Sequence, residues 1–242
     1  MSTAADLMKV TKRLNRSLAT LSFGDPVTHT YNPLEYGWAA HEIFLKRYAD
    51  TKKRVIFLGM NPGPFGMAQT AVPFGEVAAV RDWMKIETSI GKPKPEHPKR
   101  PVTGFECTRS EVSGRRLWGL FSERYPKAEQ FFKDHFVVNF CPLVFMEESG
   151  RNRTPDKLSK DERKVVYDLC DQYLAEVVSV LQPKWVIGVG GFALKRAKEV
   201  LSDYPELELG CILHPSPASP AANRGWAEQA SQQLEELGIW KR

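Results

Sequence analysis

Four short runs of β-branched and apolar residues stand out along the chain. They occupy residues 54–58, 136–140, 184–189 and 210–213. Each run is four to six residues long and nearly continuously hydrophobic rather than alternating. This pattern is typical of strands that are buried on both faces of a sheet, so we expect four buried strands.

The stretches between these runs carry helical patterns. In residues 161–181, apolar side chains from Val165 to Leu181 recur at a spacing of three or four. Patterns of the same kind cover residues 36–49, 114–125, 192–201 and 221–237. Strands that alternate with helices predict a parallel sheet with helices on both faces, which is an α/β fold.

The main irregular segment is residues 90–109, which contains four prolines and several basic residues. It is either a linker between two domains or a surface excursion within one domain. We favour the excursion, because the strands on both sides of it are needed for one sheet. A length of 242 residues also favours one large domain, spanning residues 1–242, over two small ones.

The composition excludes several classes of protein. With 42% hydrophobic and 26% charged residues, the chain is neither disordered nor fibrous, and no apolar run approaches the 18 residues of a membrane span. The N-terminal residues lack a secretory pattern, so we expect an intracellular protein, in the cytoplasm or nucleoid of a bacterium or the nucleus of a eukaryote. No helix shows a second apolar stripe, which favours a monomer.

The charge and the cysteines narrow the partners and cofactors. The net charge of +5 is compatible with a polyanionic partner. The four cysteines, at positions 107, 141, 170 and 211, form no C-x-x-C pair. We therefore expect isolated, partly buried thiols in a reducing compartment, and neither a metal nor another cofactor.

Three polar residues follow the predicted strands at their carboxyl ends. Asn61 comes after the first strand, Asn139 lies at the end of the second, and His214 follows the fourth. Ligands of open parallel sheets bind at this edge. The three side chains are therefore expected to converge on one site, although each also has a structural alternative, such as a backbone-bridging asparagine or a buried histidine.

Residues 59–76 form a long loop of unusual composition, with four glycines, three prolines and one charged residue. No G-K-[ST] follows, so this is not a phosphate-binding loop. A rigid, neutral loop suits a planar heterocycle, which Phe74 would stack upon; alternatively, the loop is a tight turn capped by Asn61, and Phe74 belongs to the core.

Two further segments are candidates for contact with a polyanion. The proline-rich loop after His214 is stiff enough to be inserted into a partner, and Ser219 or Pro220 is expected to start the final helix, whose amino end can receive a phosphate. Residues 149–164 carry six basic residues. They form either a solvated helix entry or a surface that contacts a phosphate backbone.

Four segments carry a resemblance to a known family: residues 59–76, 110–119, 139–146 and 214–226. In this order they resemble the single-strand-selective monofunctional uracil-DNA glycosylases, within the uracil-DNA glycosylase superfamily. The resemblance implies a three-layer α/β/α sandwich around a four-stranded parallel sheet. It also implies removal of uracil and oxidised pyrimidines such as 5-hydroxymethyluracil from single- and double-stranded DNA, without lyase activity.

Residue by residue, the resemblance implies catalytic roles for Asn61 and His214. It implies substrate binding by Gly59, Met60, Gly63, Phe74 and Asn139. It implies DNA contacts from a basic segment and from the wedge after His214, namely Arg151, Arg153, Lys157, Lys160, Pro215, Ser216, Pro217, Ala218, Ser219, Asn223 and Arg224.

The sequence departs from the family pattern at two positions. Ala71 replaces an expected glycine beside the pocket, where its methyl group would crowd bulky 5-substituents, and Ala218 replaces a large basic residue in the wedge. Three alternatives stay open: a glycosylase that prefers deaminated purines such as xanthine or hypoxanthine, a damaged-base binder without turnover, and an enzyme that acts on free nucleosides.

Overall fold

The computed structural model describes residues 2–241 and contains a central sheet of four parallel strands. The spatial order of the strands is β3-β2-β6-β7. Their bounds are β2 (Val55–Gly59), β3 (His135–Asn139), β6 (Trp185–Val189) and β7 (Glu208–Ile212). All four predicted strands are confirmed, with bounds shifted by at most two residues.

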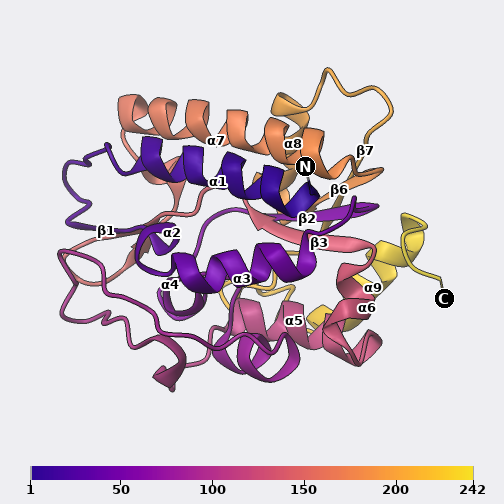
Figure 1. Ribbon diagram of the computed structural model, residues 1–242, viewed down its shortest axis with the longest axis horizontal. Coiled ribbons are helices and arrows are strands. Elements are labelled where there is room, and N and C mark those ends of the chain that lie inside the picture. Colours follow the sequence, from indigo (N-terminus) through magenta and orange to yellow (C-terminus); the bar gives the residue numbers. More distant parts are fainter. Residues whose placement is uncertain (1, 242) are drawn as a thin grey trace.

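Helices cover both faces of this sheet (Figure 1). One layer contains α1 (Thr3–Leu18), α7 (Lys160–Leu181) and α8 (Gly191–Val200). The other contains α3 (Trp38–Tyr48), α5 (Val112–Arg124), α6 (Ala128–Phe132) and α9 (Trp226–Glu236). The predicted α/β/α sandwich is therefore confirmed. Aromatic side chains fill the second interface, where the rings of Phe57 and Phe121 lie 4.9 Å apart.

A second, small antiparallel sheet was not predicted. Its order is β1-β4-β5, with β1 (His29–Tyr31), β4 (Val144–Met146) and β5 (Asn152–Arg153). The remaining short elements are α2 (Pro33–Tyr36), α4 (Met67–Thr70), η1 (Ala79–Trp83), η2 (Gly104–Glu106) and η3 (Pro155–Lys157). No helix within residues 2–241 is long and apolar enough to cross a membrane.

Two predicted helices have different bounds in the structure. The helix expected over 36–49 is divided at Gly37, where an added Cβ would lie 2.6 Å from the Cβ of Ala71. The expected start of the final helix at Ser219, Pro220 or 221 was wrong, because α9 begins at Trp226.

Local backbone geometry explains the later start of α9. Gly225 has a φ of +83°, which interrupts the helical path between the preceding turns and Trp226. The Gln229 side chain then donates hydrogen bonds to the carbonyl oxygens of Ala221 and Arg224, at 3.0 and 3.1 Å. Residues 220–225 are turns and Ser219 is irregular, so residues 219–225 provide no helix N-terminus for a phosphate.

The proline-rich segment, residues 90–109, is attached to the fold through the buried side chain of Gln69. Its Nε2 donates to the carbonyl oxygens of Pro64 and Pro101, at 2.9 and 3.1 Å. Its Oε1 accepts from the backbone amides of Thr103 and Gly104, at 2.9 and 3.1 Å. All hydrogen-bonding capacity of this amide is used, and the segment is tied to the glycine-rich loop.

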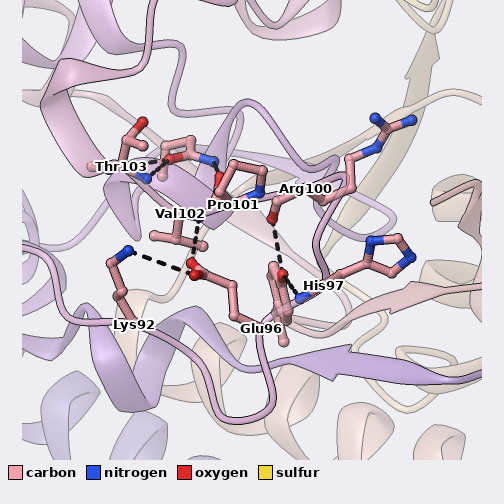
Figure 2. A network of polar contacts seen from close by, with 10 residues as sticks. Lys92, Glu96, His97, Arg100, Pro101, Val102 and Thr103 are labelled. Carbon is pink, nitrogen blue, oxygen red and sulfur yellow. Dashed lines mark hydrogen bonds and ion pairs between the residues drawn. The ribbon is translucent and has the colours of Figure 1, made fainter.

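A second group of hydrogen bonds fixes the middle of this segment (Figure 2). The hydroxyl of Tyr31 donates to the carbonyl oxygen of Arg100 at 2.8 Å and accepts from the amide of His97 at 2.7 Å. The carboxylate of Glu96 accepts from the amide of Val102 at 2.8 Å. The segment is therefore an ordered excursion that follows the surface.

The division into domains stays a prediction: we expect residues 1–242 to form one domain. In support, the buried side chains of both helical layers belong to one hydrophobic cluster.

The prediction of isolated cysteines required one correction. All four are free, but the buried thiols of Cys141 and Cys170 are neighbours, and burial together with the Cys141 thiol raises the pKa of Cys170.

Candidate active site

A cavity of about 480 Å³ lies at the carboxyl edge of the parallel sheet. Its lining includes Asn139, the last residue of β3, and residues that follow β2 and β7, among them Asn61 and His214. The volume falls in the range of about 300–1,000 Å³ that small-ligand sites occupy. The three polar side chains that follow the predicted strands therefore meet around one cavity, together with Met60, Gly63, Phe74, Ser216 and Pro217.

Gly59 does not itself line the cavity, but it contacts two residues that do, Asn139 and Phe74. A Cβ at this position would lie 2.3 Å from Oδ1 of Asn139 and 2.5 Å from Cε2 of Phe74. Only glycine allows both side chains to approach the strand end so closely. Phe74 itself has a φ of +53°, a left-handed conformation that is unusual for a bulky residue and that recurs at functional sites.

The Asn61 side chain is oriented by a carbonyl group. Its Nδ2 donates to the carbonyl oxygen of Leu143 at 3.2 Å. Because a carbonyl only accepts, the amide nitrogen must face Leu143, and Oδ1 has no hydrogen-bond donor among residues 2–241. Asn61 therefore lines the cavity with its orientation fixed and its acceptor unused.

Asn139 is 6% exposed and has a weak partner. Its Nδ2 lies 3.4 Å from the sulfur of Met67, which is a poor hydrogen-bond acceptor. A buried amide with so weak a partner gains by binding a stronger acceptor. The side chain thus offers a donor and an acceptor to a ligand in the cavity.

His214 presents a defined tautomer. The backbone amide of Ser216 donates to Nδ1 at 3.1 Å, so Nδ1 is unprotonated and the proton of the neutral ring resides on Nε2. Burial lowers the pKa of His214 below the ordinary value of 6.5, which favours this neutral form. The rings of His214 and Phe74 have centroids 6.4 Å apart, and both line the cavity.

Glu111 is the cavity-lining carboxyl group that sequence reasoning missed. A Cβ on Gly63 would lie 2.5 Å from its Oε2, and a Cβ on Gly66 would lie 2.9 Å from its Cγ. The two glycines therefore make room for Glu111. Burial raises the pKa of this carboxyl group, and a hydrogen bond from the Ser113 amide partly opposes that shift.

The loop after His214 is fixed by Arg116 of α5. This guanidinium donates to the carbonyl oxygen of Pro215 at 3.0 Å and to Oδ1 of Asn223 at 2.9 Å. Nδ2 of Asn223 in turn donates to the carbonyl oxygen of Pro217 at 2.9 Å. Pro217 and Ala218 are left exposed, while Ser219 is half-buried and Arg224 is exposed.

The basic segment places its charges unevenly. Arg153 pairs with Glu147 at 2.6 Å and donates to the carbonyl oxygen of Lys157 at 2.9 Å. Lys157 also lies 3.7 Å from Asp156. Among the described residues 2–241, no carboxylate pairs with Arg151 or Lys160, and both are exposed. Of the four basic residues of this segment predicted to contact DNA, Arg151 and Lys160 therefore have charges that no carboxylate balances in the described part of the chain.

The lining of the cavity differs from the sequence-based prediction at Ala71 and in several additional residues. Ala71 does not line the cavity: it is fully buried and faces Gly37, so the expected crowding of 5-substituents by its methyl group was wrong. Other lining residues were not assigned from the sequence, namely Phe65, Arg109, Ser110, Glu111, Asn152 and Thr154. The resemblance of residues 110–119 was a usable signal for Glu111. Within residues 2–241, no three His, Cys, Asp or Glu side chains gather as metal ligands.

Comparisons with known proteins assign the chain to a family. A model of the uracil DNA glycosylase superfamily matches residues 45–237. The chain belongs to the uracil-DNA glycosylase superfamily. The single-strand selective monofunctional uracil-DNA glycosylase of Rattus norvegicus is 48% identical to this glycosylase over 239 residues, which cover 98% of this chain and 86% of the relative. The Bos taurus protein of the same name is 47% identical over 239 residues, covering 98% and 88%.

These relatives place the glycosylase in the single-strand-selective monofunctional family, which confirms the resemblance of the four sequence segments. Superfamily members hydrolyse N-glycosidic bonds, so the predicted class of hydrolase is confirmed. The crystal structure of Pedobacter heparinus SMUG2 shares the fold, with a TM-score of 0.71 at 19% identity, covering 99% of this chain and 100% of the other.

Proposed function

We propose that this glycosylase flips a uracil nucleotide out of DNA and hydrolyses its N-glycosidic bond, leaving an abasic site for base excision repair. The observation that carries the proposal is the meeting of Asn61, Phe74, Asn139 and His214 around one cavity. A base inside a stacked duplex is out of reach, and flipping it costs a few kcal/mol. Single-stranded DNA avoids most of that cost and is the favoured substrate.

In this proposal the flipped uracil stacks on Phe74 and pairs with Asn139. Nδ2 of Asn139 donates to uracil O4, exchanging the weak Met67 sulfur for a carbonyl oxygen, and Oδ1 accepts from N3–H. Cytosine presents a donor and an acceptor in the opposite arrangement. The amide therefore discriminates between the two pyrimidines by hydrogen bonding. The backbone of residues 59–63, including Met60 and Gly63, lies against the base.

Heterolysis breaks the bond between C1′ and N1, and the electron pair leaves with the uracil. Nε2–H of His214 donates a hydrogen bond to uracil O2, where negative charge develops. A preorganised donor of this kind contributes about 3–4 kcal/mol to lowering the barrier. The neutral tautomer described above supplies that donor without a proton transfer.

A water molecule then attacks C1′ and loses its proton to solvent. Asn61 is an amide and no general base, so its free Oδ1 orients the water instead. The four motifs place no lysine for attack on C1′, which agrees with a monofunctional reaction. The uracil anion takes up a proton from solvent, so the products are free uracil and an abasic site in an intact strand.

The test uses a labelled single-stranded oligonucleotide with one uracil, treated with hot alkali after incubation. Strand breaks that appear only after alkali support the proposal. Intact strands after alkali would refute it and favour a binder without turnover. Free uridine or deoxyuridine as the better substrate would favour a nucleoside enzyme, and preferential release of xanthine or hypoxanthine would favour the purine alternative.

Base reading is tested by Asn139→Asp, which replaces the donor with an acceptor. The expected result is a strong loss of preference for uracil over cytosine. The control is Gln232→Glu, which converts an exposed amide on α9, away from the cavity lining, into a carboxylate. An unchanged preference in Asn139→Asp would contradict base reading by Asn139.

The finer substrate range extends this proposal. We propose activity on 5-hydroxymethyluracil and on double-stranded DNA, with the wedge of residues 215–219 filling the gap in the duplex and Arg224, Arg151 and Lys160 near the phosphates. The exposed Ala218 is a small wedge residue, so double-stranded activity should be weaker than single-stranded activity. We further propose a monomer inside the cell, in the nucleoid or the nucleus.

A further inference from the structure

The mouth of the cavity carries a stack of one aromatic ring and two guanidinium groups. The guanidinium carbon of Arg109 lies 4.0 Å from the ring centroid of Phe65, and that of Arg100 lies 5.5 Å from the same centroid. Phe65 and Arg109 line the cavity that contains Asn61 and His214. The family resemblance and the proposed reaction assign no role to this stack.

The positive charge of the stack is uncompensated. Arg100 donates from Nε to the carbonyl oxygen of Gly150 at 2.8 Å and from NH1 to that of Lys99 at 3.0 Å, so its partners are neutral. In the described part of the chain, no carboxylate pairs with either arginine. The Arg109 side of the stack is exposed. The stack therefore presents a planar cationic surface to solvent.

The stack is also held in place before any ligand binds. Phe65 follows Pro64, whose carbonyl oxygen is held by Gln69 at 2.9 Å, and the same Gln69 side chain binds the segment that leads to Arg109. Figure 2 shows the network that fixes the middle of this segment, including the backbone around Arg100. Little ordering is left to be done when a ligand binds, which favours affinity.

We infer that the stack of Phe65, Arg109 and Arg100 binds the nucleotide next to the flipped one in single-stranded DNA. Aromatic rings bind successive bases by stacking without regard to sequence, and arginine adds cation–π and phosphate contacts. When the flipped nucleotide occupies the cavity, the rest of the DNA strand must leave through the mouth of the cavity, where this stack lies. The inference rests on the proposed function, because the DNA strand is its ligand.

The experiment measures binding of a single-stranded oligonucleotide whose target nucleotide is 2′-fluoro-2′-deoxyuridine, which resists hydrolysis. Fluorescence anisotropy gives the Kd at several salt concentrations. Arg109→Ala should weaken binding about tenfold and reduce the slope of log Kd against log salt by about 0.7, the single-strand value for one lost phosphate contact. The control Lys52→Ala removes an exposed charge before β2, at the opposite edge of the sheet.

Two further measurements separate charge from stacking. Arg109→Lys should restore the salt slope but only part of the affinity, because lysine lacks the planar group. A 2-aminopurine placed 5′ or 3′ of the target should be quenched at one of the two positions, and Phe65→Leu should relieve the quenching. Equal Kd values for Arg109→Ala and Lys52→Ala, or quenching at neither position, would overturn the inference.

Turnover of the same oligonucleotide with uracil at the target position tests the proposed function separately. If the wild type turns over but Arg109→Ala does not change binding, the inference about the stack is refuted and the proposed function stands. Absence of wild-type turnover refutes the proposed function, whatever the variants bind.

Discussion

At the scale of single residues, the protonation state of His214 connects the site to pH. Its pKa lies below 6.5 because burial disfavours the charged ring, so the neutral form persists as pH falls through 6.5. Protonation at a lower pH places a proton on Nδ1, facing the donor amide of Ser216. Single-turnover rates should therefore stay level from about pH 8 to 6.5 and fall only at more acidic pH.

The check is a rate profile measured together with circular dichroism, which identifies acid unfolding. A decline centred at or above pH 6.5 would contradict the assignment of the neutral tautomer. In His214→Ala, turnover should fall about 10²–10³-fold with little change in substrate binding, because the donor acts on charge that develops only in the transition state.

Glu111 carries a prediction about stability. Its pKa is raised in the folded protein, so the ionised carboxylate destabilises the fold at neutral pH relative to the unfolded chain. The penalty disappears below the ordinary value of 4.5, where the group is protonated in both states. Glu111→Gln should therefore raise the Tm at pH 7 by about 1–3 °C and leave it unchanged near pH 4.

Scanning calorimetry at the two pH values measures this difference. Glu123→Gln, an exposed substitution on α5, the helix that Glu111 directly precedes, is the matched control and should change the Tm little at either pH. A lower Tm of Glu111→Gln at pH 7 would mean that the carboxylate makes a favourable ionic contact there.

At the scale of elements, helix α5 positions the loop after His214 through Arg116. The guanidinium bridges Pro215 and Asn223, which in turn holds Pro217. Arg116→Ala removes two charge-assisted hydrogen bonds of about 1.5–3 kcal/mol each from a loop that holds the proposed donor. We expect kcat to fall about tenfold, with KM much less affected.

A double-mutant cycle with Asn223→Ala tests whether the two residues act together. Their effects on kcat should be strongly non-additive, since either substitution breaks the same bridge. Arg116→Lys should restore only part of the lost kcat, because one ammonium group cannot reach both acceptors. Additive effects, or an unchanged kcat in Arg116→Ala, would exclude a positioning role.

The elements also show which structural features a sequence can predict. The parallel strands were predictable because short, continuous apolar runs such as 136–140 are typical of strands covered on both faces. Helix α1 was not predicted, although Leu7, Val10, Leu14 and Leu18 form a buried stripe of helical spacing. β5 is two residues long and carries no pattern of its own, so the sequence did not predict that Asn152 lines the cavity.

The candidate site likewise contains residues that the sequence predicts and residues that it does not. Asn61, Asn139 and His214 were found because each follows a predictable strand, and the edge of a parallel sheet brings strand ends together. Glu111 and Arg109 precede a helix that does not end at that edge. Their arrival depends on the path of residues 90–109, which Gln69 fixes by hydrogen bonds that no periodicity reveals.

At the scale of the whole molecule, two buried histidines should make the fold sensitive to acid. His41 donates from Nδ1 to the carbonyl oxygen of Ala71 at 2.8 Å, and His135 donates to that of Phe131 at 3.1 Å. The Nε2 of each ring is buried without a partner within residues 2–241. Burial accordingly lowers both pKa values from 6.5 to about 4.

Because the unfolded chain binds these protons first, the free energy of unfolding should fall as pH drops from 6.5 to 4, by about 3 kcal/mol for each histidine. Urea titrations at about pH 7, 5.5 and 4.5 measure the decline. His135→Phe keeps the stacking with Phe131 and should make the decline shallower by about half, and adding His41→Phe should remove most of the rest. Parallel declines in the wild type and both variants would show that other groups govern the acid response.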